Sequence, residues 1–170
     1  MKKLLFIIML FASLPILAQN KSVEHLTFVG IPICGTLENF DKQITEKGFK
    51  HVYGAFYDGV FGGEETTIQI CVTESINNVY SVVVYANETD NLEDIKTLLN
   101  VWVKRYESKY QEQAKLDDDG SYTIIVNGKN DLLGGIFISY FKVDEKYKIG
   151  IQYIDNIGNR KDSEIKNKDL

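Results

Sequence analysis

The sequence predicts an α+β protein in which two helices pack on one face of an antiparallel sheet. Two segments, from Leu37 to Ile44 and from Leu92 to Tyr106, carry apolar residues at helical spacing. Each is followed by segments in which apolar and polar residues alternate, which is typical of strands with one buried face. The order of a helix and then strands occurs twice, and turn residues separate the strands, so we expect one layer of helices on one antiparallel layer of strands.

The first helix is signalled at both of its ends. Residues 23–33, rich in β-branched and aromatic residues, predict a strand before it. Thr36 is the expected N-cap. Gly48 is the expected residue just past the helix end, and Phe49 then stands where a Schellman motif places its hydrophobic contact.

A three-stranded meander is predicted after this helix. Residues 50–62 combine aromatic and β-branched residues with glycines, and they predict a strand with a bulge or a sharp bend. Residues 66–73 and 79–86 alternate cleanly and are joined by a turn.

The second half repeats this order. Asp90 or Asn91 is the expected cap of the long helix, since each has an acidic residue three positions later. Its apolar stripe is expected to face the core rather than a partner helix. Three strands are predicted at residues 121–127, 135–142 and 147–154. The last two match strands of the first half at offsets of 68 and 67 residues, so a tandem helix–three-strand repeat and a chance match of alternating patterns both fit.

Residues 1–18 have the pattern of a signal peptide. Lys2 and Lys3 precede the apolar run Leu4–Leu17, which is shorter than the roughly 20 residues that span a bilayer, and the small residue Ala18 stands just before the expected cleavage point. We therefore expect an exported protein, periplasmic or extracellular, without stable membrane insertion after cleavage. Residues 19–155 would form a single domain, and residues 156–170 a polar, flexible tail.

The charge balance narrows the class of partner. The chain has 19 basic and 24 acidic residues and a formal net charge of −5, and removal of Lys2 and Lys3 with the signal would make it more negative. Nucleic acids and anionic membranes attract basic surfaces. We therefore expect no nucleic-acid partner, and we expect an unknown protein or envelope component instead.

The sequence contains no recognisable reactive cluster. It has no Gly-x-Ser-x-Gly, no His-Glu-x-x-His and no phosphate-binding glycine loop. The two histidines and two cysteines (His25, His51, Cys34 and Cys71) include no pair with the short spacing of zinc ligands. We expect no catalytic residue, no cofactor and no metal site.

Cys34 and Cys71 raise the question of a disulfide. In an oxidising compartment the two thiols would be able to pair. Cys71, however, falls on the polar face of its predicted strand, and Cys34 precedes a helix. Both alternatives stay open, and we prefer two free thiols.

The segment 51–65 has the most unusual composition. Aromatic residues occur at both parities of the predicted strand, and glycines between them allow close backbone approach. Tyr53, Tyr57 and Phe61 are therefore our candidates for a binding surface. The alternative is that they pack in the core, because aromatic residues dominate cores as well as interfaces.

Several stretches resemble a family of small exported proteins of unknown function from Gram-negative gut anaerobes. They are His25-Leu-Thr-Phe-Val-Gly-Ile-Pro-Ile-Cys-Gly-Thr-Leu-Glu-Asn-Phe, Lys47-Gly-Phe, Val79-Tyr-Ser-Val-Val-Val-Tyr and Ile149-Gly-Ile-Gln-Tyr-Ile-Asp. Such proteins usually have an acidic or other polar residue at the position of Cys34. The tandem layout is also similar to the β-lactamase-inhibitory-protein-like fold, which outer-membrane assembly lipoproteins of the small-protein-A type share. This similarity implies a protein that binds other proteins through its sheet.

Three functions remain in view. The leading hypothesis is an exported, non-catalytic binding module that uses the open face of the sheet. The second is an enzyme acting on an envelope polymer, which would need a pocket that gathers His51 with Asp58, Glu64 or Glu65. The third is a small-ligand carrier, with a cavity between helices and sheet lined by Phe40, Ile44, Trp102 and Tyr106.

Overall fold

The computed structural model describes residues 24–73, 77–129 and 131–157. The predicted signal peptide, and the predicted tail beyond residue 157, lie outside the described residues. Within the described ranges no helix has the length and apolar character needed to cross a membrane.

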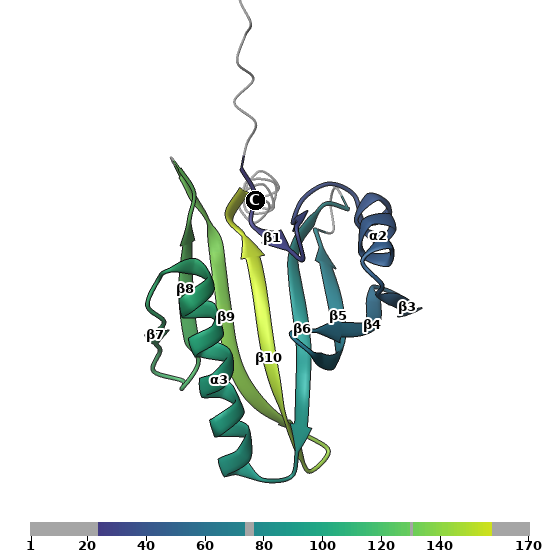
Figure 1. Ribbon diagram of the computed structural model, residues 1–170. Coiled ribbons are helices and arrows are strands. Elements are labelled where there is room, and N and C mark those ends of the chain that lie inside the picture. The colour runs from purple at the N-terminus through teal and green to yellow at the C-terminus, as the bar shows by residue number, and fades with distance from the viewer. Residues whose placement is uncertain (1–23, 74–76, 130, 158–170) are drawn as a thin grey trace, which may run out of the picture.

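The centre of the protein is an antiparallel sheet of eight strands (Figure 1). In space the strands follow the order β3-β4-β5-β6-β10-β9-β8-β7, and each neighbouring pair is antiparallel. The final strands of the two halves, β6 and β10, therefore lie side by side in the middle. The bounds are β3 (Lys50–Tyr53), β4 (Phe56–Phe61), β5 (Glu64–Val72), β6 (Val79–Thr89), β7 (Lys115–Leu116), β8 (Tyr122–Asn127), β9 (Leu132–Val143) and β10 (Lys146–Asp155).

Both predicted helices form with the predicted caps. Helix α2 (Leu37–Glu46) begins after Thr36, whose hydroxyl accepts the Asn39 N–H, and ends in the hydrogen bonds of a Schellman motif around Gly48 (φ 92°). Helix α3 (Leu92–Tyr110) begins after Asn91, whose side chain accepts two backbone N–H groups of the first turn. Of the two caps that the sequence offered for α3, Asn91 is the one used.

The two helices share one face of the sheet, as predicted. The Tyr57 hydroxyl donates to Asp41 on α2, and the Tyr106 hydroxyl of α3 contacts that of Tyr153 on β10. Tyr57 pairs with Ile68 on β5, Ile68 pairs with Val84 on β6, and Val84 pairs with Ile151 on β10, two residues before Tyr153. Because paired residues share a face, both contacts fall on the same side of the sheet. One continuous core joins this face to the helices.

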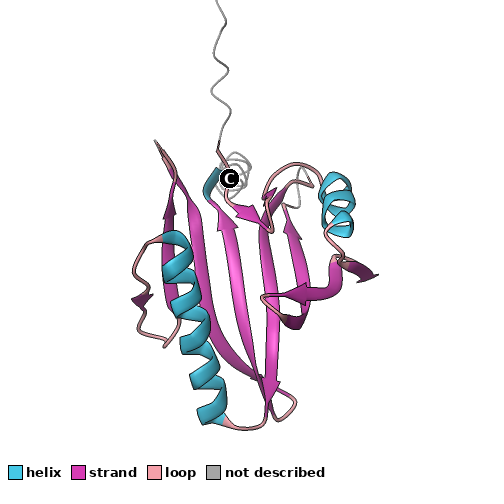
Figure 2. Cartoon of the chain, viewed as in Figure 1, coloured by secondary structure: helices cyan, strands magenta, loops and turns pink. Residues whose placement is uncertain are grey.

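A small hairpin lies between the helices on this core face (Figures 1 and 2). It consists of β1 (Thr27–Phe28) and β2 (Ile31–Pro32), joined by a tight turn at Val29 and Gly30, both of which have positive φ. The ring of Phe28 contacts Phe49, Phe61 and Tyr153. The prediction of one strand over residues 23–33 was therefore wrong, because the chain reverses at Gly30.

The prediction of one bent strand over residues 50–62 was also wrong. The chain turns back at Gly54 (φ 54°), so β3 and β4 form a hairpin in which Tyr53 pairs with Phe56. Short edge strands at β3 and β7 give each half a helix followed by four strands, rather than the three that the sequence suggested.

Candidate functional site

The candidate site is the face of the sheet opposite the helices. Among the described residues no helix or hairpin covers this face, and several large apolar side chains on it are exposed. Val60 on β4 is 67% exposed and Phe137 on β9 is 38% exposed. Singly exposed apolar residues are ordinary, but a group of them on one uncovered face is typical of a binding surface.

Two pairs of aromatic rings stand on this face. Tyr53 and Phe56 stack at a centroid distance of 4.8 Å, at one edge of the sheet. Tyr85 on β6 and Phe141 on β9 form an edge-to-face pair at 5.9 Å, across β10. Gly150 on β10 makes the second pair possible, because a Cβ at this position would come within 3.0 Å of the Phe141 ring.

Polar side chains occupy the floor between the two ring pairs. The Thr67 hydroxyl donates to Asp58 at 2.7 Å, and the Tyr85 hydroxyl donates to Gln69 at 2.9 Å. A tyrosine phenol is protonated at neutral pH, and burial raises the pKa of Tyr85 further, so this hydrogen bond also persists in mildly alkaline solution. The floor is thus ordered by its own contacts before any partner binds.

The two ring pairs, together with Asp58 and Thr67, line a broad groove of about 1440 Å³. Charged residues form its rim, including Glu64 and Glu65 at the start of β5. At the same end of the neighbouring strand β6, hydrogen bonds from Lys146 and Lys148 lower the pKa of Glu88 to about 2, so this carboxylate stays charged even in mildly acidic solution. The groove therefore has aromatic walls, a polar floor and a charged rim.

Of the three predicted binding residues, the structure places only Tyr53 on this face. Tyr53 is 63% exposed and lines the groove. Tyr57 is 1% exposed and bonded to α2, and Phe61 stacks on Trp102 of α3. The alternative of core packing holds for Tyr57 and Phe61, because both lie on the core face of β4.

Sequence reasoning missed Tyr85 and Phe141 as surface residues. Their strands were predicted with nearly correct bounds, and alternation from the buried Val84 and Ile138 places both on the uncovered face. The signal was therefore present in the strands, but the composition of residues 51–65 drew attention away from it.

Cys34 and Cys71 are not joined by a disulfide in the structure. Cys71 lies on the uncovered face of β5 opposite Ser81 of β6, whereas Cys34 follows the β1–β2 hairpin on the core side. Burial raises the pKa of the Cys71 thiol, and a hydrogen bond with Ser81 offsets part of this rise. The preferred alternative of two thiols agrees with this arrangement.

The residues named for an enzyme do not gather in one place. Asp58, Glu64 and Glu65 all line the groove. His51 pairs with Tyr57 on the other face, where its Nε2 bonds the carbonyl of Gly54 at 2.8 Å. Asp58 and Glu65 are therefore separated from His51 by the thickness of the sheet, and Glu64, which pairs with Phe61, stands at the far end of β4 from the partner of His51.

The positions named for a ligand carrier are filled by core packing. Phe40 and Ile44 are fully buried, and Trp102 and Tyr106 are 3% exposed and contact neighbouring rings. This arrangement counts against a cavity at these positions.

No group of three or more His, Cys, Asp or Glu side chains is placed to hold a metal ion in the part of the chain that the structure describes. Comparison of the chain with models of protein families, with curated proteins and with solved structures gave no match.

Proposed function

We propose that this chain is an exported, non-catalytic module that binds another protein through the groove on its uncovered sheet face. The observation that carries the proposal is the arrangement of two aromatic pairs within a charged rim on a face that no described helix or hairpin covers. Protein interfaces have this anatomy, with aromatic side chains in the centre and polar ones at the edge.

The size of the groove favours a protein over a small molecule. Pockets for small ligands enclose about 300–1,000 Å³ and bury most of the ligand. The groove is larger, at about 1440 Å³, and extends across strands from β4 to β9. A chain segment or loop of a partner fills such a space better than a small metabolite does.

Site-specific photo-crosslinking tests the proposal in the living cell. A photoreactive amino acid at Val60, on the groove, is compared with one at Val101, an exposed apolar residue on the outer side of α3. We expect a discrete crosslinked protein from position 60 and none from position 101. Crosslinks of equal strength from both positions, or from position 101 alone, would contradict the proposal.

The identified partner then allows a quantitative test. Tyr53→Ala is expected to weaken the affinity of the purified pair by about tenfold or more, the loss of an interface hot spot. Val101→Ala is the control and is expected to leave the affinity unchanged. The thermal midpoints of both variants are expected to match the parent, because neither side chain is in the core. An unchanged affinity in Tyr53→Ala would remove this residue from the interface.

A further inference from the structure

A second hollow, separate from the groove, lies beside the β1–β2 hairpin. It has a volume of about 700 Å³, and its lining includes His25, Cys34, Glu24 and Lys129. None of its lining residues is shared with the groove. It brings together a thiol and an imidazole, the two groups that make a nucleophilic cysteine.

The hairpin brings His25 and Cys34 to the same end of its two strands. Thr27 pairs with Pro32, and the Ile33 N–H donates to the Leu26 carbonyl at 2.8 Å, which extends the ladder by one residue pair. The ladder ends there, because the Cys34 N–H donates to the Pro32 carbonyl at 2.9 Å; His25 and Cys34 are the residues that flank this last pair. Leu26 and Ile33 are buried in the core, whereas His25 and Cys34 both line the hollow.

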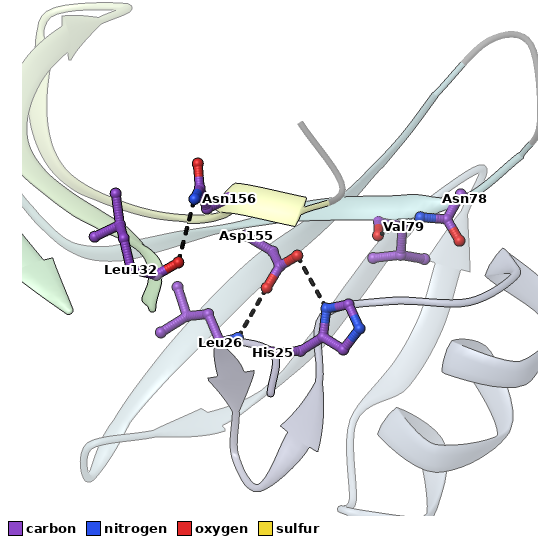
Figure 3. Close-up of polar contacts among 7 residues, drawn as sticks. All are labelled: His25, Leu26, Asn78, Val79, Leu132, Asp155 and Asn156. Carbon is purple, nitrogen blue, oxygen red and sulfur yellow. Dashed lines mark hydrogen bonds and ion pairs between the residues drawn. The ribbon is translucent and has the colours of Figure 1, made fainter. Parts of the chain in front are cut away.

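A buried carboxylate holds the imidazole (Figure 3). Asp155, at the end of β10, is fully buried; one of its oxygens accepts the Leu26 N–H at 2.8 Å, and the other lies 3.0 Å from Nδ1 of His25. An ionised carboxylate only accepts hydrogen bonds, so Nδ1 carries the proton and Nε2 is the basic nitrogen of the neutral ring. Figure 3 shows this second nitrogen pointing away from Asp155. The side chain of His25 is 19% exposed, so the ring remains accessible.

We propose that Cys34 is a reactive thiol, activated by His25 and Asp155. It reacts with small disulfides from the medium and forms a mixed disulfide. The imidazole accepts the thiol proton, and the resulting thiolate attacks one sulfur of the disulfide. The new bond joins Cys34 Sγ to that sulfur, the original S–S bond breaks, and the departing thiolate takes up a proton. The product is one Cys34 adduct and one free small thiol. This site is independent of the proposed docking face.

The second cysteine of the chain does not resolve such an adduct. Cys71 lies on the opposite face of the sheet, across from Ser81, and burial raises the pKa of its thiol. The mixed disulfide at Cys34 therefore persists until an external thiol removes it, which makes Cys34 a modification site rather than half of a redox pair. Cys71 also provides a comparison within the chain, but its burial alone slows its reaction, so activation of Cys34 is judged by the His25 variant and the pH profile below.

The test measures the rate of adduct formation with 2-hydroxyethyl disulfide, a neutral probe, by intact mass spectrometry of the reduced, purified chain. Cys71→Ser leaves only Cys34, and Cys34→Ser leaves only Cys71. We expect Cys34 to react at least about tenfold faster than Cys71 at pH 7, since a thiolate paired with imidazolium is populated well below pH 8.5, where ordinary thiols ionise. Equal rates for the two thiols would overturn the proposal.

The role of His25 is tested by His25→Gln in the Cys71→Ser background. The rate at pH 7 is expected to fall about tenfold, and the pH at which the rate rises is expected to move upward, toward that of an ordinary thiol. Glu24 and Lys129 also line the hollow and Asp155 lies behind the ring, so other charged groups face His25. The pH dependence of the rate is therefore measured in parallel for the protein that keeps His25. If His25→Gln fails to fold, the pH profile of Cys34 in the parent decides. A rise centred near pH 8.5 overturns the proposal, and a plateau below pH 8 supports it.

Discussion

Tyr53 and Tyr57 stand four positions apart in the chain and lie on opposite faces of the sheet. Two residues, Gly54 and Ala55, form the turn between β3 and β4, and Tyr53 pairs with Phe56 across it. Paired residues share a face and successive residues alternate, so Tyr57 points to the core while Tyr53 points to the groove. Because the chain turns here instead of forming one bulged strand, the two tyrosines that we predicted for the same binding surface lie on opposite faces.

Alanine substitutions distinguish these two positions by their effect on stability. Tyr57→Ala is expected to lower the free energy of unfolding by about 3–5 kcal/mol, because it empties a fully packed site. Tyr53→Ala is expected to change it by less than about 0.5 kcal/mol, as for an ordinary surface position. Urea denaturation followed by circular dichroism measures both. Tyr57→Phe is the matched control and keeps the ring while losing the hydrogen bond to Asp41, worth about 1 kcal/mol. Similar losses in Tyr57→Ala and Tyr53→Ala would mean that the two residues do not differ in burial.

At the scale of elements, local sequence signals predicted the positions of the helices well and those of the hairpins poorly. Thr36, Gly48 and Asn91 act through hydrogen bonds within a few residues of themselves, so their roles follow from the sequence nearby. Hairpin turns at Gly30 and Gly54 look the same in sequence as a bulged strand. What separates them is whether the chain on the far side pairs with the near side or with another strand.

The cap of α3 gives a test at this scale. Asn91→Ala is expected to cost about 1 kcal/mol of stability, because the N–H groups of Glu93 and Asp94 lose their acceptor. Thermal or urea unfolding measures the change. Asn91→Ser restores a capping oxygen and is expected to recover most of the loss. A loss in Asn91→Ser equal to that in Asn91→Ala would show that the cap is not the cause.

At the scale of the whole molecule, each half contributes a helix and four strands, and the halves meet at β6 and β10. The match between the two halves that the sequence suggested is not reproduced by the pairs of residues in the sheet. It matched Ile68 with Ile136 and Val84 with Ile151. Ile68 does pair with Val84, but Ile136 pairs with Tyr153 instead. Alternating apolar patterns match at any even shift, so the pattern alone does not fix the register.

This topology predicts where the sheet opens last. Strands β6 and β10 are paired on both sides and covered by the core, whereas β3 is an exposed edge of four residues. Hydrogen exchange measured by mass spectrometry is expected to show protection in β6 and β10 close to the global stability and fast exchange in β3 through local opening. Equal protection in β3 and β10 would show that the β3 edge is covered in solution, by a partner or by a second copy.

The sequence alone determined the fold class, both helices with their caps, and most strand bounds, because these depend on periodicity and on contacts between near neighbours. It also indicated Tyr53 as a candidate residue of the exposed surface. The tertiary structure decided which aromatic residues reach the uncovered face, how the halves pair, and that Asp155 meets His25 across 130 positions of sequence. These features depend on pairing between distant strands. A shift of one residue in that pairing exchanges the two faces of the sheet, and no local pattern records it.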